Sequence, residues 1–282
     1  MNPDTPMFKD SPMKIRLRAL SHKVTWQLGT RLPNTFPFVF VVGYPKSGTT
    51  WISSLVADVL QLPFPKHSLL PIGCPAVVHG HETVWARYPR TVYTVRDGRD
   101  SLVSFYFHLA REIPDGPNPT LPRYMRPYFP ALRDKHDVQA NIARFVEAQL
   151  DRPHASPVNW PDHVRSFYDP PGGKRHANAV ALRFEDLLTD GPGALQAAMD
   201  ELAGERVDPD RVAMALDKFS FARQSKGRRA GAEDRSSFLR KGQAGDWANH
   251  FTREAGEIFA DRAGEALMLA GYETDTAWVD TL

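Results

Sequence analysis

Apolar residues fall along this chain in two patterns, as short continuous runs and as longer segments in which they recur at helical spacing. The runs predict strands over residues 38–42, 76–79, 91–95 and 178–184. The spaced segments predict helices over about residues 14–28, 49–60, 100–110, 138–150, 160–167, 193–203, 208–218 and 252–269. Because the runs are continuous, their strands should be buried on both faces. Alternating strands and helices therefore predict an α/β fold with a central parallel sheet flanked by helices.

These elements leave room for one large domain, and no internal repeat or linker interrupts them. Residues 1–35 are polar and mixed, and we expect them to form an N-terminal extension. Residues 36–275 should form the domain. Within it, residues 111–135 are rich in proline and aromatic side chains, which predicts an excursion over the surface of the domain.

The composition of the chain limits which partners and which cellular location are expected. The 282 residues are 42% apolar, enough for a sizeable core. The net charge of +2 argues against a nucleic-acid or membrane partner. Cys74 is the single cysteine, so no intramolecular disulfide and no cysteine metal motif can form. No signal peptide or membrane anchor is recognisable, and a cytoplasmic location is expected.

The strongest chemical signal lies in residues 38–51, which combine a buried strand, a glycine-bounded loop and the start of a helix. The spacing Gly43-x4-Gly48 is that of a phosphate-binding P-loop, so we expect a single P-loop domain. A nucleoside-triphosphate P-loop would place a lysine where Thr49 stands. Here the lysine is Lys46, inside the loop. The candidate phosphate ligands of the loop are Lys46, Ser47, Gly48, Thr49 and Thr50.

A second motif follows the strand at 91–95. Arg96 stands at the strand end, and Ser104 lies one turn inside the next helix. A guanidinium and a hydroxyl that converge there could hold a second, separate phosphate. Alternatively, the arginine forms a capping and salt-bridge cluster with Asp97 and Asp100.

A third motif precedes the last predicted helix, where two adjacent cations come before a glycine in Phe238-Leu-Arg-Lys-Gly-Gln-Ala-Gly-Asp-Trp247. Taken alone, it is also consistent with a solvated charge pair that binds no ligand. Taken together and in this order, the three motifs resemble those of the cytosolic-type sulfotransferases. Residues 44–51 resemble the family's 5′-phosphosulfate loop, and residues 96–104 its 3′-phosphate motif. Residues 240–247 resemble its C-terminal 3′-phosphate loop.

The resemblance implies that the donor is 3′-phosphoadenosine 5′-phosphosulfate (PAPS). The implied ligands of its 3′-phosphate are Arg96, Ser104, Arg240, Lys241 and Gly242. Trp51 and Phe221 match the positions that flank the adenine. Phe184 stands where the family usually carries tyrosine, so it can stack but offers no hydroxyl.

The family's chemistry explains the displaced lysine. In sulfuryl transfer the leaving group is a phosphate, and charge develops on its bridging oxygen. The ammonium group of Lys46, inside the loop, can stabilise that negative charge directly. No metal is needed for this step, and no metal motif is visible. The resemblance further suggests that Ser47 holds the lysine back until the acceptor is bound.

The acceptor needs a general base, and the resemblance assigns the base position to His81 of His79-Gly-His81. His79 replaces a lysine of the family. A neutral imidazole near pH 7 suits the role. Glu82 is the reserve candidate, because related carbohydrate enzymes use a glutamate. His108 is expected to pack rather than to react.

The expected function is therefore PAPS-dependent sulfuryl transfer to a hydroxyl of a small, apolar or phenolic acceptor. A carbohydrate or glycolipid sulfotransferase with the same donor is the main alternative. A magnesium-dependent nucleotide kinase and a non-catalytic nucleotide sensor are weaker ones. The acceptor pocket is expected to be lined by residues 62–75, Trp85, Phe105 and residues 111–133. Because Arg253 replaces a valine of the family's dimerisation motif, we infer no dimer of that kind.

Overall fold

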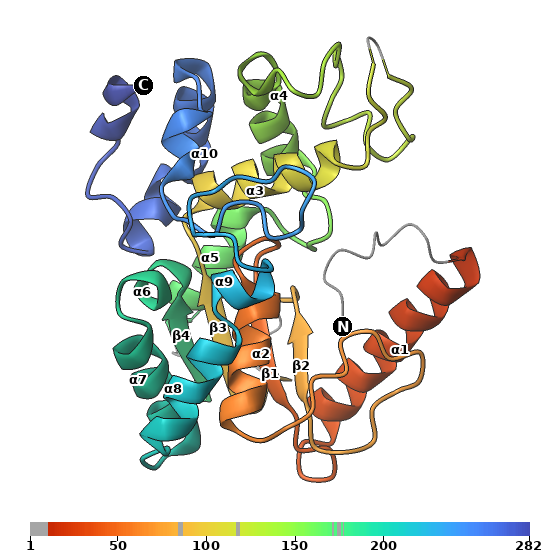
Figure 1. Cartoon of the computed structure of the whole chain (residues 1–282), viewed down its shortest axis with the longest axis vertical. Coiled ribbons are helices and arrows are strands. Elements are labelled where there is room, and N and C mark those ends of the chain that lie inside the picture. Colours follow the sequence, from red (N-terminus) through yellow and green to blue (C-terminus); the bar gives the residue numbers. More distant parts are fainter. Residues whose placement is uncertain (1–10, 84–86, 117–118, 171, 174–175, 177) are drawn as a thin grey trace.

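The computed structural model describes residues 11–83, 87–116, 119–170, 172–173, 176 and 178–282. At its centre is a parallel sheet in the order β2-β1-β3-β4 (Figure 1). The strands are β1 Val39–Gly43, β2 Val77–Gly80, β3 Thr91–Val95 and β4 Ala179–Arg183. The predicted parallel sheet is confirmed. Trp85, expected at the acceptor pocket, lies outside the described residues.

The predicted helices are all present, with ends that shift by a few residues. The α-helices are α1 Pro12–Arg31, α2 Thr49–Val59, α3 Gly98–Ala110, α4 Val138–Asp151, α5 Trp160–Tyr168, α6 Phe184–Thr189, α7 Gly191–Ala203, α8 Pro209–Lys218, α9 Phe221–Gln224 and α10 Arg253–Leu269, and the 3₁₀ helices are η3 Asp246–Asn249 and η4 Ala277–Thr281. The sequence did not predict α6, α9, η3 and η4, which are too short to show a helical period.

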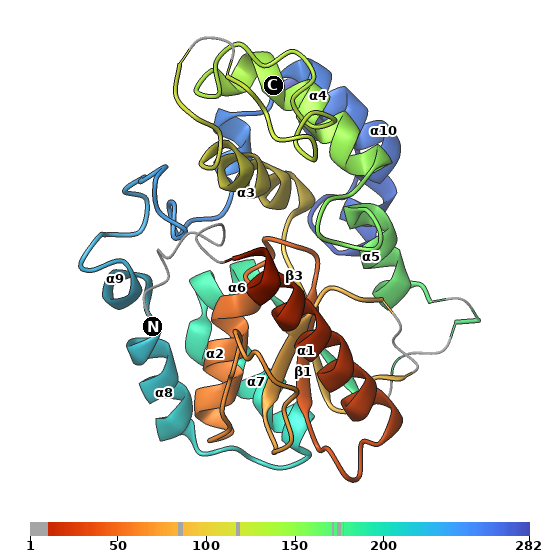
Figure 2. The same cartoon turned by 90° about the vertical axis from the view of Figure 1, so that its right-hand side faces the viewer.

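Two hydrophobic cores cover the two faces of the sheet, because successive side chains of a strand point to opposite sides. Val39 and Val41 of β1 pack in one core with residues of α2, α7 and α8. Phe40 and Val42 pack in the other, with residues of α3, α4, α5 and α10. Figure 2 shows α2, α7 and α8 together on one side of the molecule. All five residues of β1 are buried, as the continuous apolar run predicts.

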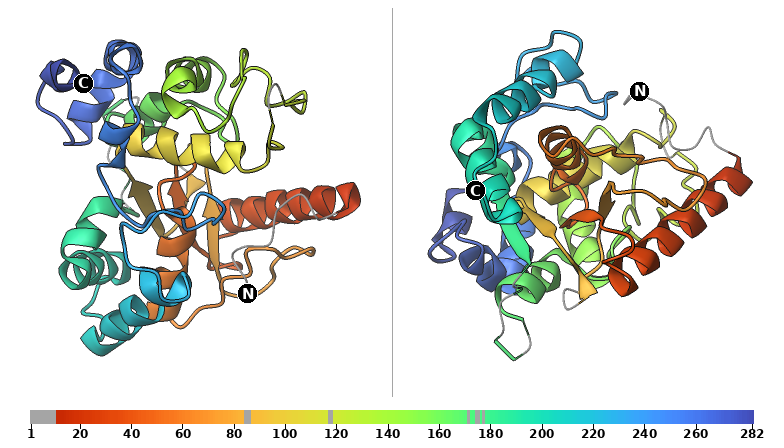
Figure 3. Two further views of the ribbon diagram at one scale, coloured as in Figure 1. Left: turned by 45° about the horizontal axis from the view of Figure 1, so that its top comes forward. Right: turned by 90° about the horizontal axis from the view of Figure 1, so that it is seen from below.

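Both ends of the chain join the larger core. In α1, which runs beside the β2 edge (Figures 1 and 3), the indole of Trp26 is buried and donates to Tyr88 Oη at 2.9 Å. In η4, Trp278 is buried in the same core. The expected bounds of the domain, residues 36–275, stay a prediction, although buried residues lie on either side of them. Within the described residues, no helix combines the length and the apolar character needed to cross a membrane.

The carboxyl ends of the strands bring the predicted chemical residues to one edge of the sheet. The chain passes from β1 to β2 on one side and then to β3 on the other side of β1. In open parallel sheets this point of reversal is where ligands bind. Figure 1 shows α3 above this edge. The loop after β1 and Arg96 after β3 therefore face the same crevice region.

Candidate functional site

The loop after β1 has the backbone of a tight phosphate cradle. Gly43 lies so close to β3 that a Cβ there would be 2.3 Å from the Thr94 hydroxyl. Gly48 caps α2 with φ +81°, and a Cβ on it would be 2.6 Å from the ring of Phe184. Lys46 also has a positive φ of 72°, a backbone conformation that residues other than glycine rarely adopt. The first turn of α2 follows directly, and its N–H groups have no partners within the helix.

Lys46 carries a half-buried ammonium that faces cations rather than acids. Its Nζ lies 4.4 Å from the ring centre of Phe238. Burial, reinforced by Arg111 and Arg96, lowers the pKa of Lys46 to about 7. Among the described residues, no carboxylate pairs with this ammonium within 4.0 Å. A cation in such a place is stabilised by an anion that the chain itself does not supply.

The hydroxyls of the loop differ in what they contact. Ser47 Oγ is buried without a hydrogen-bond partner in the part of the chain that the structure describes. Thr49 Oγ1 lies 3.4 Å from Thr94 Oγ1 of β3. Thr50 Oγ1 accepts a hydrogen bond from Lys66 Nζ at 2.8 Å. The buried, unpartnered hydroxyl of Ser47 is the group that a ligand oxygen would satisfy.

Arg96 joins the P-loop to the loop between α9 and η3, residues 225–245, here called the C-terminal loop. Its guanidinium donates to the Lys46 carbonyl at 3.3 Å and to the Gln243 carbonyl at 3.2 Å. It lies 4.5 Å from the Phe184 ring centre and 3.5 Å from a carboxylate oxygen of Asp100. The salt-bridge alternative for this motif is thus partly realised, while the same guanidinium also contacts the predicted phosphate loop.

Ser104 lies half-buried on α3, the helix that follows Arg96. Across from this helix, Arg240 of the C-terminal loop stacks on Phe107, with 4.4 Å from its guanidinium carbon to the ring centre. Phe107 lies on α3, and the backbone N–H of Gly245 donates to Asp100 of the same helix at 2.7 Å. The second and third motifs, which are separate in the sequence, therefore meet at α3.

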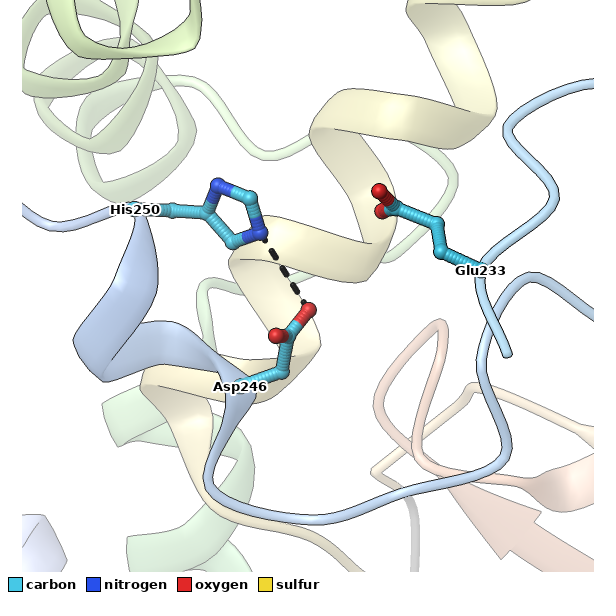
Figure 4. A group of neighbouring side chains, drawn as sticks. All are labelled: Glu233, Asp246 and His250. Carbon is cyan, nitrogen blue, oxygen red and sulfur yellow. Dashed lines mark hydrogen bonds and ion pairs between the residues drawn. The ribbon is translucent and has the colours of Figure 1, made fainter. Parts of the chain in front are cut away.

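Asp246 anchors the cations of the C-terminal loop. Its carboxylate accepts from Arg240 at 2.5 Å and from Lys241 at 2.5 Å. It also accepts from His250 at 3.2 Å (Figure 4). Hydrogen bonds from these three groups hold the pKa of Asp246 well below its ordinary value, against the opposing effect of burial. The neighbouring carboxylate of Glu233 also pairs with Arg240.

Glu233, Asp246 and His250 offer ligand atoms that lie within 4.8 Å of one another, as a metal site requires (Figure 4). However, both carboxylates already pair with Arg240, and Asp246 also pairs with Lys241. These cations neutralise the charge that would attract a metal ion. The group is better described as an ion-pair network that fixes Arg240 and Lys241.

The aromatic residues predicted to flank adenine lie around the start of α2 and α9. The Trp51 indole donates to the Phe219 carbonyl at 2.9 Å. Its ring lies edge-on to Phe184, with centroids 5.6 Å apart. Phe221 packs against Gly242, where a Cβ would lie 2.3 Å from the phenyl ring. Phe221 is therefore in direct contact with the predicted 3′-phosphate loop.

His81, which follows β2, is held by the P-loop itself. Its Nδ1 lies 2.6 Å from the Gly43 carbonyl oxygen. Because a carbonyl can only accept, Nδ1 is the donor, and the neutral ring carries its lone pair on Nε2. Burial lowers the pKa of His81, although the bond to Gly43 opposes that shift. The ring is therefore neutral near pH 7 and has the tautomer that a base needs.

Comparisons with known proteins decide the family. A family model described as a sulfotransferase domain matches residues 76–271. This chain belongs to the sulfotransferase domain family. It is 25% identical over 267 residues to a 3-alpha-hydroxysteroid sulfotransferase of Cavia porcellus, covering 82% of this chain and 83% of that protein. It is 24% identical over 263 residues to cytosolic sulfotransferase 1 of Danio rerio, covering 78% and 79%.

The fold of this sulfotransferase is also that of solved sulfotransferases. A mouse sulfotransferase complexed with PAP superposes with a TM-score of 0.60 at 20% identity, covering 94% of both chains. A retinol dehydratase in complex with androsterone and PAP gives a TM-score of 0.55 at 18% identity, covering 92% of this chain and 94% of that one. The predicted fold class and the predicted enzyme class, a sulfotransferase, are confirmed. The roles of individual residues stay predictions.

The reserve base candidate of this sulfotransferase, Glu82, and the nearby His108 both have other contacts. Glu82 turns back on its own strand end, where a carboxylate oxygen accepts from the His81 backbone N–H at 3.0 Å. His108 Nδ1 lies 3.3 Å from a guanidinium nitrogen of Arg111, which leaves it as an acceptor. Burial, together with Lys46 and Arg111, lowers the pKa of His108 to about 3, so it is a poor base.

Sequence reasoning placed Lys66 and Arg111 only within the expected acceptor-pocket segments, 62–75 and 111–133, and Phe238 only in the third motif. It did not predict that these three residues lie beside the P-loop lysine. Lys66 lies in a proline-rich loop, and Arg111 lies one residue beyond α3. Neither belongs to a motif. Lys66 is far in the sequence from the predicted strand ends, and only the tertiary fold brings it to Thr50.

Proposed function

We propose that this protein transfers the sulfuryl group of PAPS to a hydroxyl group of a small acceptor. The observation that carries this proposal is the environment of Lys46, a half-buried ammonium inside a P-loop. Its neighbours in the described part of the chain include the Phe238 ring and several cations, and none of them is a carboxylate within 4.0 Å. Family membership supplies the reaction class. The PAP complexes of similar solved structures support PAPS as the donor.

The proposed donor site has two anionic subsites. The P-loop residues, from Lys46 to Thr50, would hold the 5′-phosphosulfate, and the loop geometry supports this assignment. The 3′-phosphate would be held by Arg96, Ser104 and the cations of the C-terminal loop. The contact of Arg96 with both loops supports placing the two subsites side by side.

In the proposed mechanism, the neutral His81 Nε2 takes the proton of the acceptor hydroxyl. The acceptor oxygen then forms a bond to sulfur, and the bond between sulfur and the bridging oxygen breaks. The electron pair stays on the 5′-phosphate of the departing PAP, where Lys46 stabilises it. The hydrogen bond from His81 to the Gly43 carbonyl supports these roles of His81 and Lys46, because it holds the proposed base beside the P-loop.

The proposed acceptor is small and apolar or phenolic. An aromatic cluster at α3 supports this, since the exposed Tyr124 stacks on His154 with centroids 5.6 Å apart, and Phe105, buried in α3, lies 5.9 Å from the same imidazole. Relatives are named for hydroxysteroids and for amines. These names favour a small-molecule acceptor over a carbohydrate or glycolipid. A cytoplasmic location stays a prediction.

The test is a transfer assay with labelled PAPS and a panel of acceptors, namely a hydroxysteroid, a phenol, an aliphatic alcohol, an amine and a monosaccharide. We expect label to appear on at least one of the first three in the absence of Mg²⁺. A parallel assay with ATP and Mg²⁺ examines the kinase alternative, and phosphoryl transfer there without sulfuryl transfer would overturn the proposal.

A further inference from the structure

Lys66 brings a second ammonium group to the P-loop. It lies in the loop between α2 and β2, residues 60–76, and its Nζ donates to Thr50 Oγ1 at 2.8 Å. The same nitrogen is 5.5 Å from the ring centre of Phe238, and Lys46 Nζ is 4.4 Å from that centre. Two ammonium groups from different loops thus converge on one aromatic ring beside the start of α2.

This arrangement costs energy in the free protein. Like charges repel, and both side chains are half-buried, where water screens that repulsion less. Burial lowers the pKa of Lys66, and the charge of Lys66 contributes to the lowered pKa of Lys46.

Three other lysines of the described chain have acidic partners. Lys135 pairs with Asp115, Lys218 with Asp58 and Lys241 with Asp246. Within the described part of the chain, neither Lys46 nor Lys66 has a carboxylate within 4.0 Å. Two converging cations without an acidic partner are compensated when an anion binds between or beside them.

We propose that Lys66 is a second cationic ligand of the 5′ end of the donor, acting beside Lys46. The inference rests on the proposed function. An ammonium has three N–H donors, and the bond to Thr50 uses one of them, which leaves two for oxygens of the 5′-phosphosulfate. As the bond between sulfur and the bridging oxygen breaks, one more negative charge stays on the 5′-phosphate. Lys66 shares that charge with Lys46.

The experiment compares two nucleotides that differ only at the 5′ end, PAP and adenosine 3′-phosphate, by titration calorimetry on the wild-type protein and on variants. We expect Lys66→Met to weaken PAP binding by roughly tenfold or more, the typical effect of losing a hydrogen bond to a charged group. The affinity for adenosine 3′-phosphate should stay within about twofold, because its charge lies at the other subsite. Lys66→Arg should restore most of the PAP affinity.

Lys23→Met is the matched control, because it removes the same charge from an exposed position on α1. It should leave both affinities unchanged. If Lys66→Met does not fold, Lys66→Gln removes the charge while keeping a donor for Thr50, and the same losses are expected.

The outcomes distinguish a failure of the Lys66 assignment from a failure of the proposed function. If the wild-type protein binds PAP and Lys66→Met binds it equally well, the assignment of Lys66 is wrong and the proposed function stands. Equal losses for PAP and adenosine 3′-phosphate would likewise reduce Lys66 to a structural role. If the wild-type protein binds neither nucleotide, the proposed function fails, and the assignment of Lys66 fails with it.

Discussion

At the scale of single residues, the central feature is an ammonium whose environment favours its neutral form. Lys46 has an ordinary pKa of 10.5, and burial beside other cations lowers that pKa to about 7 in the free protein. The unfolded chain therefore binds a proton that the folded chain has released between about pH 7 and pH 10.5. Stability should rise with pH across that window as the cost of burying the charge disappears.

Donor binding should reverse this shift, because an anion beside Lys46 favours the charged form. We predict that PAP binding at pH 8 takes up a proton, which is measured as a difference in binding enthalpy between buffers of different ionisation enthalpy. Lys46→Met should reduce the uptake. Equal enthalpies in both buffers for the wild-type protein would contradict the environment described for Lys46.

His81 and Glu82 are neighbours with different surroundings, which makes their roles separable. We predict that His81→Ala abolishes sulfuryl transfer, with a loss on the order of 10²-fold or more. PAP affinity should remain nearly intact, because the imidazole acts on the acceptor. Glu82→Gln should retain most of the activity, since its carboxylate is turned toward the His81 N–H. Strong transfer by His81→Ala would show that His81 is not the base, and a loss of transfer confined to Glu82→Gln would assign that role to Glu82.

At the scale of elements, the C-terminal loop and α9 form one side of the proposed nucleotide site. Gly242 and Gly245 both have positive φ, 64° and 77°. A Cβ on Gly242 would lie 2.3 Å from the Phe221 ring, whereas the described part of the chain leaves the space beside Gly245 open. The two positions therefore share a strained backbone conformation, but only Gly242 contacts Phe221, the ring predicted to flank the adenine.

We predict that Gly242→Ala weakens PAP binding by about tenfold, the lower end of what a stacking contact with a base contributes. Gly245→Ala is the matched control, and its loss of stability should be similar while PAP affinity changes little. Calorimetric titration and thermal unfolding of both variants provide the comparison. Equal affinities for the two variants would remove Phe221 from the nucleotide site.

The elements themselves show how far sequence reasoning extends. The strand at 91–95 was predicted with the bounds that β3 has, because a fully buried parallel strand needs a continuous apolar run. The four-residue helices α9 and η3 were missed, since they are set by local capping and tertiary contacts. Three motifs pointed to the family because each combines several residue types at fixed spacing. The position of Lys66 at the P-loop was missed because only the packing of its loop on α2 brings it to Thr50.

At the scale of the whole molecule, Arg99 ties α3 to the end of the chain. Its guanidinium pairs with Asp97 and with Glu273, each at 2.7 Å. It lies 3.8 Å from the Trp247 ring centre and 4.4 Å from that of Trp278. This buried group thus connects the start of α3 with η3 and η4 near the end of the chain.

We predict that Arg99→Met lowers the free energy of unfolding by about 3–5 kcal/mol, because it leaves the carboxylate of Asp97 buried without its partner. Arg144→Met, which breaks an exposed ion pair with Glu147 at 3.0 Å, should cost about 0–1 kcal/mol. Chemical denaturation measures both values. A loss of stability in Arg99→Met no larger than that in Arg144→Met would show that the contacts of Arg99 contribute little to the stability of the fold.

The central claim is that one site holds two separate phosphate groups of an adenosine nucleotide. The most direct test is calorimetric titration of the wild-type protein with PAP and with adenosine 5′-phosphate, which differ only in the 3′-phosphate. We predict that PAP binds at least about 100-fold more tightly, since the 3′-phosphate adds charge-assisted hydrogen bonds. Equal affinities for the two nucleotides would contradict the claim.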